Sequence, residues 1–266
     1  MAGSVFETIV CGVDGTPASD EAVRQAAAVA DEGSKLVLVS VVDEASAAAA
    51  TAPGGGIVLP PPTVELENQA LAEAAEAVRK ERPGLAVETV VLEGPVLPTL
   101  LQALSDREAT LAVVGRHGHS RLAGVFLGSA MTKLLHDAPC AVLVAGSSGE
   151  EVAFPRWVVV GYDGSEQAAA AVRAAVEISH RTEAPLDALC ARGGKEVDVE
   201  ALQASLTALA PGVSLTVEDE DPVHALVSAG ADLVVVGTRG LHGMKSLGSV
   251  SERVAHKADC SVLVVR

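Results

Sequence analysis

The sequence predicts an α/β fold in which two tandem domains each contain an open five-stranded parallel sheet with helices on both faces. Two observations lead to this prediction. The chain has 266 residues, which suggests about two domains of ~150 residues each. One pattern of alternating apolar runs and amphipathic stretches also occurs twice along it, and such an order is typical of a parallel, helix-covered sheet.

The repeat is visible at both ends of each copy. The segment CGVDGTPASDEAVRQAA, which starts at Cys11, matches VGYDGSEQAAAAVRAAV from Val160. Later in each copy, GSAMTKLLHDAPCAVLV from Gly128 matches GSVSERVAHKADCSVLV from Gly248 at 8 of 17 positions. The polar, glycine-bearing segment AGSSGEEVAF separates the copies. We therefore expect one domain over residues 1–147 and a second over residues 153–266.

The first copy defines the expected elements. Thr8–Val13 is a short apolar strand, Thr16 is a suitable N-cap, and Pro17 suits the first helical position. Apolar residues then recur at helical spacing as far as Ala30. The second copy is shorter in its middle, and much of what it lacks is the Ala-, Gly- and Pro-rich segment Ala45–Pro62, an expected loop. The elements expected after the first helix are the strand Lys35–Val42, the helix Thr63–Arg82, the strand Ala86–Gly94, the helix Pro95–Ser105, the strand Thr110–Gly115, the helix Ser129–Asp137 and the strand Cys140–Gly146.

Composition narrows the classes of function. Hydrophobic residues make up 49% of the chain and aromatic residues only 2%, so we expect a core of Val, Leu and Ala. A net charge of −16 argues against nucleic acid and anionic membranes as partners. No apolar run approaches the ~18 residues of a membrane span, and the N-terminus lacks a signal-peptide pattern, which favours the cytoplasm. The four cysteines form no CxxC pair and lie in apolar runs, so we expect buried thiols.

The segment GRHGHSRLAGVFLGS, residues 115–129, is the first candidate functional feature. It follows an apolar strand and leads into a helix, so it belongs to the carboxyl edge of the sheet, where open parallel sheets bind ligands. Glycines let the backbone approach a ligand, and the N–H groups of a helix N-terminus favour phosphate. Ser129 adds a hydroxyl donor. His117 and His119 are phosphate donors or exposed loop residues.

Asp14 is the second candidate, because it lies at the end of the first strand and therefore on the same edge. Its carboxylate can accept a hydrogen bond from a ribose hydroxyl or an adenine amine. It can also form an Asx-type turn or cap ahead of the following helix. The two roles are compatible.

The second copy retains part of this arrangement. Asp163 matches Asp14, and the glycine pattern recurs from Gly237 to Ser249. Seven residues separate the last two glycines of this pattern, where nine separate them in the first copy. Two alternatives stay open: the loop is shortened at its outer tip and still holds a ligand, or its phosphate cradle is misplaced.

The spacing G-x2-G-x9-G-(S/T) in residues 115–129 resembles the pattern of the universal stress protein family, in its ATP-binding branch. VCGVDGTPASDEAVRQAA resembles the family's opening strand and helix, and APCAVLV resembles its closing strand. The resemblance covers nearly the whole chain, twice over. It implies tandem Rossmann-like (adenine nucleotide alpha hydrolase-like) domains that bind ATP, with Mg²⁺ as an option and AMP or cyclic AMP as alternative ligands.

The resemblance also assigns roles in the first copy. It implies that Asp14 contacts ribose or base and that Val41 and Val114 line the adenine pocket. The residues that it assigns to ribose and phosphates are Gly115, Gly118, Gly128, Ser129 and Ala130. The full set of candidate cofactor-binding residues is Gly12, Val13, Asp14, Val41, Val114, Gly115, Gly118, Gly128, Ser129 and Ala130 in the first copy, and Tyr162, Asp163, Val236, Gly237, Gly240, Gly248, Ser249 and Val250 in the second.

The favoured function is that of a nucleotide-binding stress-response protein whose conformation or assembly responds to its ligand. Neither glycine loop contains Gly-Lys-Ser/Thr, so the chain is not a P-loop NTPase. A slow ATPase is the alternative from the enzyme class, although no residue is recognisable as a base that activates water. A nucleotide-free interaction scaffold is the third hypothesis. We assign no catalytic residue and no metal ligand: the acidic run Val217–Pro222 is expected to be a solvated turn, and His136 and His256 are expected to cap helix C-termini.

The last strand of each copy predicts how the chain assembles. Cys140–Gly146 and Cys260–Arg266 are apolar and lack interior charges, and a final strand commonly lies at a sheet edge with unpaired backbone groups. We expect the two copies to pack as a pseudo-two-fold pair within the chain. We also expect a homodimer of chains.

Overall fold

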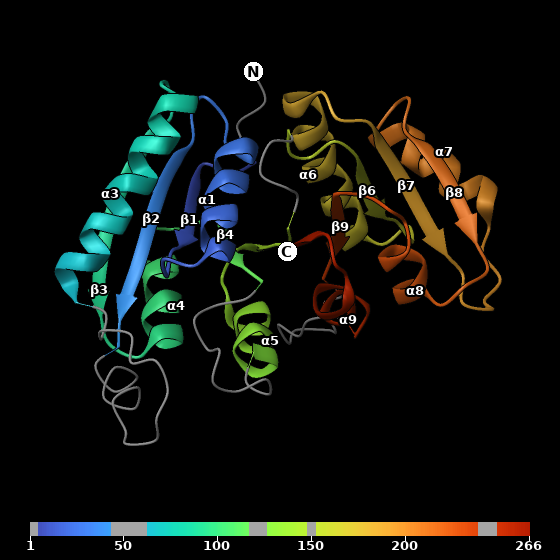
Figure 1. Cartoon of the computed structure of the whole chain (residues 1–266). Helices are drawn as coiled ribbons and strands as arrows, with labels where there is room; N and C mark the ends of the chain where they lie inside the picture. Colours follow the sequence, from blue (N-terminus) through green and yellow to red (C-terminus); the bar gives the residue numbers. More distant parts are fainter. Residues whose placement is uncertain (1–4, 44–62, 117–126, 148–152, 239–248) are drawn as a thin grey trace.

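The structure is a computed structural model that describes residues 5–43, 63–116, 127–147, 153–238 and 249–266 (Figure 1). We call residues 5–147 the first half and residues 153–266 the second half. The elements of the first half are β1 (Thr8–Gly12), α1 (Pro17–Val29), β2 (Lys35–Val42), α3 (Val64–Glu81), β3 (Ala86–Glu93), α4 (Val96–Asp106), β4 (Leu111–Gly115), α5 (Leu127–Asp137) and β5 (Ala141–Ala145). Those of the second half are β6 (Val158–Gly161), α6 (Glu166–Thr182), β7 (Leu186–Ala191), α7 (Val199–Leu209), β8 (Ser214–Glu218), α8 (Pro222–Val227), β9 (Leu233–Gly237), α9 (Ser249–Lys257) and β10 (Ser261–Val265).

All ten strands form one continuous sheet, in the order β3-β2-β1-β4-β5-β10-β9-β6-β7-β8. Each half contributes five parallel strands, as the α/β pattern predicts. The halves meet where β5 and β10 run antiparallel, with Leu143 opposite Leu263. The expected internal pairing is therefore confirmed, and the last strands lie at the centre of the sheet. Its edges are β3 and β8.

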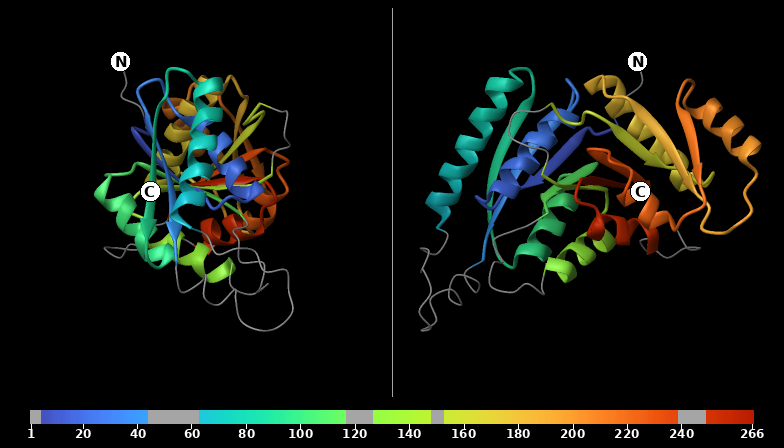
Figure 2. Two further views of the ribbon diagram at one scale, coloured as in Figure 1. Left: turned by 60° about the vertical axis from the view of Figure 1, so that its left-hand side comes forward. Right: turned by 45° about the vertical axis from the view of Figure 1, so that its right-hand side comes forward.

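The helices form two layers, one on each face of the sheet (Figure 2). One hydrophobic cluster joins the sheet to α1, α3, α6 and α7, and a second joins the opposite face to α4, α5, α8 and α9. Side chains along each strand alternate between the clusters; Ile9 and Cys11 belong to the first, and Val10 to the second. Because both faces are covered, the strands are nearly continuous apolar runs. Both clusters extend across the β5–β10 junction, so the two halves share their cores.

Capping residues set the helix boundaries much as predicted. The Thr16 side chain accepts a hydrogen bond from the Ser19 N–H at 3.3 Å, and Pro17 occupies the first helical position of α1. Thr63 caps α3 in the same way. The helix expected from Ser129 begins two residues earlier, at Leu127. The expected loop Ala45–Pro62 lies outside the described residues. Two helices of the second half are clearly shortened: α7 has 11 residues where α3 has 18, and α8 has 6 residues where α4 has 11.

A buried group of three hydrogen bonds, here called the polar clasp, joins the halves beside the β5–β10 pair. The Gln25 amide of α1 donates to the Gly146 carbonyl at 2.8 Å. The Ser261 hydroxyl of β10 donates to the Gln25 side-chain oxygen at 2.8 Å and accepts from the Gly146 N–H at 3.0 Å. Glycine is required at position 146, because a methyl group there would lie 2.6 Å from the Cys260 carbonyl carbon.

No helix in the described part of the chain is long and apolar enough to cross a lipid bilayer.

Candidate functional site

The candidate site lies at the carboxyl edge of the first half, between the ends of β1 and β4. This is the point where the strand order reverses, and it is where open α/β sheets form their binding crevice. Gly12 ends β1 there, and a methyl group on it would lie 3.5 Å from Val114 Cγ1. Strand β2 continues past β1, since Gly12 pairs with Val39, and this extension carries Val41 to the same edge.

Val41 and Val114 give this crevice a partly exposed apolar wall. Both pack against the hydrophobic cluster on the α4/α5 face, and both remain partly open to solvent. Val13 differs, because its side chain is buried in the cluster on the α1/α3 face. The structure therefore brings Gly12, Val41 and Val114 together, and leaves only the backbone of Val13 at the crevice.

Asp14 forms the turn that connects β1 to α1. Its Oδ1 atom accepts hydrogen bonds from the Thr16 N–H at 3.2 Å and the Thr16 hydroxyl at 2.5 Å. Gly15, between them, has a φ of +67°, a conformation that glycine adopts readily. The Asx-type turn offered as one interpretation of Asp14 is therefore present, and it fixes the carboxylate at the edge of the crevice.

The second half repeats this turn. Asp163 Oδ1 accepts from the Ser165 N–H at 3.1 Å and the Ser165 hydroxyl at 2.6 Å, and Gly164 has a φ of +79°. The preceding residue, Tyr162, is only 3% exposed, and its hydroxyl lies 2.8 Å from Ser205 Oγ of α7. Tyr162 is thus a core residue between β6 and α7, on the face of the sheet away from Val236.

Gly115 and Gly237 end β4 and β9, and their role in the structure is a close helix crossing. A methyl group on Gly115 would lie 2.5 Å from the Ala18 carbonyl oxygen in the first turn of α1. A methyl group on Gly237 would lie 2.3 Å from the Gln167 carbonyl oxygen in α6. These glycines let α1 pack closely against β4 and α6 pack closely against β9, a reason for glycine that the sequence pattern did not reveal.

The remaining candidates belong to the loops and helices that follow these strands. Gly128, Ser129 and Ala130 lie in the first turn of α5, and Ser249 and Val250 open α9. Because α5 follows β4 directly in the fold, its N-terminus faces the same edge as Asp14. The candidates that lie outside the described residues are Gly118, Gly240 and Gly248, together with His117 and His119.

Arg116 is a residue of this region that the sequence did not single out. It directly follows Gly115, and its guanidinium donates to the Ala255 carbonyl at 2.8 Å and to the Cys260 carbonyl, both in the second half. Arg266 makes the reverse connection, from the end of β10 to the Cys140 carbonyl at 2.9 Å and the Leu135 carbonyl. Burial lowers the pKa of both arginines. An arginine of each half therefore donates a hydrogen bond to a carbonyl near the end of a helix in the other half.

The two histidines of helices α5 and α9 also connect the halves. His136 and His256 lie in the last turns of these helices, as expected. His136 Nε2 is 3.4 Å from Glu252 Oε2, and His256 Nε2 is 2.9 Å from Thr132 Oγ1. The contacts are reciprocal, since the histidine of α5 contacts α9 and the histidine of α9 contacts α5.

The four cysteines are free thiols, and the predicted burial is found for three of them. Cys11, Cys140 and Cys190 are buried and Cys260 is partly buried. Burial raises the pKa of all four thiols, that of Cys140 to about 11. A raised pKa favours the protonated thiol, which is the less nucleophilic form. Within the described ranges, no group of three or more His, Cys, Asp or Glu side chains is arranged to hold a metal ion.

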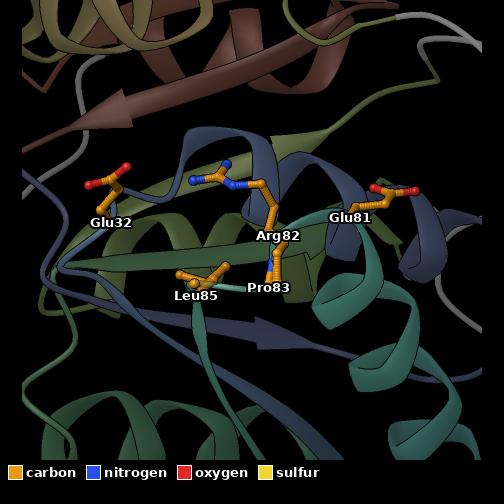
Figure 3. A pocket seen from close by; sticks show the side chains of 6 residues that line it. Glu32, Glu81, Arg82, Pro83 and Leu85 are labelled. Atoms are coloured by element: carbon orange, nitrogen blue, oxygen red, sulfur yellow. The ribbon is translucent and has the colours of Figure 1, made fainter.

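A pocket of about 230 Å³ lies at the opposite edge of the first half (Figure 3). Its lining residues come from the end of α3 and from the turns that precede β2 and β3, which are the amino ends of the strands. Arg82 crosses the pocket to donate to the Ala27 and Ala30 carbonyls at the end of α1, at 2.7 and 3.0 Å. Glu32 and Glu81 make the pocket unsuited to an anion. The lining residues are Glu32, Glu81, Arg82, Pro83, Gly84 and Leu85.

Comparison with known proteins points to one family. The model of the universal stress protein family matches residues 6–146 and 191–266. A universal stress protein of Mycolicibacterium smegmatis is 31% identical over 286 residues, covering 97% of this chain and 96% of that protein. One from Mycobacterium tuberculosis is 32% identical over 289 residues, with the same coverage of 97% and 96%.

The fold is also found among solved structures. A universal stress protein from Archaeoglobus fulgidus matches with a TM-score of 0.66 at 18% identity, over 99% of this chain and 97% of that chain. At this identity the match bears on the fold alone, and it extends over both halves of the sheet.

Proposed function

Because this chain belongs to the universal stress protein family, we propose that its first half binds an adenine nucleotide and that the protein is a ligand-regulated stress-response protein. On this proposal the ligand acts by changing conformation or assembly, and no residue of the chain is assigned a catalytic role. The two halves correspond to domains over residues 1–147 and 153–266, in a protein of the cytoplasm.

The observation that supports the proposal is the arrangement of residues at the switch point between β1 and β4, where open parallel sheets bind ligands. Val41 and Val114 are apolar and partly exposed there, which suits one face of a purine base. Asp14 lies in the adjoining turn, where a carboxylate can accept a hydrogen bond from a ribose hydroxyl or the adenine amine. The first turn of α5 follows β4, and the N–H groups of a helix N-terminus attract phosphate.

ATP is the ligand that we propose first, accompanied by Mg²⁺ on its phosphates. AMP and cyclic AMP share the adenine and ribose that Val41, Val114 and Asp14 would contact, so they are the natural competitors. Bound phosphates would add charge that the N–H groups of α5 partly offset.

The test is direct measurement of binding to the intact chain. The freshly purified protein is denatured, and the supernatant is assayed for released nucleotide. The emptied, refolded protein is then titrated calorimetrically with ATP, AMP, cyclic AMP and GTP, each with and without Mg²⁺. We expect saturable binding of the adenine nucleotides and none of GTP. A folded protein that binds no adenine nucleotide in either assay would contradict the proposal, and phosphate release over several hours would instead indicate a slow ATPase.

We also propose that the chain forms a homodimer. The β5–β10 pair is used inside the chain, so the contact between chains would involve another surface, formed by helices or by the carboxyl edge.

A further inference from the structure

We infer that each chain takes one nucleotide, held by the first half, because α8 fills the equivalent crevice of the second half. This inference rests on the proposed function of the first half. It is carried by a comparison of matched positions in the two halves, all of them among the described residues.

The first difference is how closely a leucine approaches the central strand. In the first half, a methyl group on Gly12 would lie 4.0 Å from Cδ2 of Leu100 in α4. In the second half, a methyl group on Gly161 would lie 3.3 and 3.4 Å from the two methyl carbons of Leu226 in α8. Leu226 therefore lies against the end of β6, where its counterpart leaves more room over β1.

The second difference is the exposure of the apolar wall. Val114 is partly exposed at the first crevice, whereas its counterpart Val236 is 4% exposed. Leu226 belongs to the same hydrophobic cluster as Val236, lies like it beside Gly161, and is itself 5% exposed. An adenine ring would need the contact surface that Leu226 already occupies.

The third difference is that α8 is tied to the helix that opens the phosphate region. Asp221 caps α8 by accepting from the Val223 and His224 N–H groups at 3.1 and 3.2 Å. Its Oδ1 also lies 3.8 Å from the Arg253 guanidinium of α9. Pro95 stands at the position of Asp221 in the first half, so this ion pair has no equivalent there. The pair links the start of α8 to α9.

The fourth difference is charge. The segment from the end of β8 into α8 carries four acidic residues, Glu218–Asp221, where the matched segment Leu92–Pro95 carries one. Arg192 and Arg253 offset part of this charge. The remaining negative charge disfavours the binding of a polyphosphate nearby, because like charges repel. The glycine pattern of the second half is also two residues shorter in the sequence.

The stoichiometry of the intact chain tests the inference. Native mass spectrometry and calorimetry with saturating Mg²⁺-ATP count the nucleotides bound per chain. We expect one. Two bound nucleotides per chain would overturn the inference while leaving the proposed function in place. No bound nucleotide would instead remove the proposed function, and the inference with it.

Amide hydrogen exchange with and without ATP then locates the bound nucleotide without any substitution. We expect at least about threefold slower exchange in residues 13–18 and 114–116, since a ligand stabilises the segments that it contacts. The matched segments 162–167 and 236–238 serve as the internal control, and their exchange is expected to be unchanged. Protection in the second-half segments alone, or equally in both halves, would overturn the inference.

Discussion

At Asp14, one carboxylate oxygen accepts both hydrogen bonds of the β1–α1 turn. A test of its role in ATP binding must therefore remove the negative charge and keep the turn. Asp14→Asn does this, because an amide oxygen can still accept from the Thr16 N–H and hydroxyl. We expect ATP affinity to fall by about 1–2 kcal/mol, roughly five- to thirtyfold, as a charge-assisted hydrogen bond becomes a neutral one. The melting temperature should change by less than about 2 °C. Calorimetric titration and thermal melting measure the two effects.

Asp163→Asn is the matched control, since Asp163 forms the same turn ahead of α6. If only the first half binds nucleotide, this variant keeps the affinity of the unchanged protein. A large drop in the melting temperature of Asp14→Asn with unaltered affinity would mean that Asp14 serves the turn alone.

At the residue scale, the sequence predicts local chemistry well and distant contacts poorly. The N-cap Thr16 and the Asx-type turn at Asp14 involve residues within three positions of one another, so their side chains alone indicate them. Gln25 looks like an ordinary polar helix residue, and its partner Ser261 is 236 positions away. Arg116 is hidden in the same way, because its acceptors are backbone carbonyls of the other half. No local pattern encodes a contact with a carbonyl group so far along the chain.

At the scale of elements, the crossing of α1 over β4 depends on Gly115. We expect Gly115→Ala to lower the free energy of unfolding by about 1–3 kcal/mol, because its methyl group would force α1 away from the strand. Gly12→Ala is the control, since a methyl group there makes only ordinary contacts at 3.5 Å or more. Its effect should stay within about 0.5 kcal/mol. Urea unfolding gives both values, and equal losses in the two variants would show that the crossing tolerates a side chain.

Element order and sheet type were predictable because alternating apolar strands and capped helices are local patterns. The different packing of Leu100 against β1 and of Leu226 against β6 was not predictable. Leu100 and Leu226 are the same residue type at the same position, and only the packing of the shorter α8 moves one of them closer to its strand. The glycine pattern alone therefore does not indicate how differently these two leucines pack.

At the scale of the whole molecule, β5 and β10 pair with each other inside the chain, so the predicted homodimer requires a different contact surface. Light scattering of the wild-type chain is expected to give twice the mass of one 26.9 kDa chain. The last strands are unavailable for this contact, since Val142 and Val262 are buried in the internal ladder. Val142→Lys combined with Val262→Lys should therefore aggregate or unfold the chain, because it buries two unpaired charges. A wild-type protein that stays monomeric at high concentration, with and without ATP, would contradict the homodimer.

The polar clasp makes the junction between the halves selective for unlike partners. The second half has Ala174 at the position of Gln25, and the first half has Ala141 at the position of Ser261. Two first halves placed edge to edge would leave the Gln25 side-chain oxygen without its hydroxyl donor, and two second halves would leave the Ser261 hydroxyl without the Gln25 oxygen that accepts from it. Each such mismatch costs about 1–3 kcal/mol for a buried unsatisfied group. The hydrogen bonds of the clasp therefore favour the pairing of a first half with a second half over the pairing of two like halves.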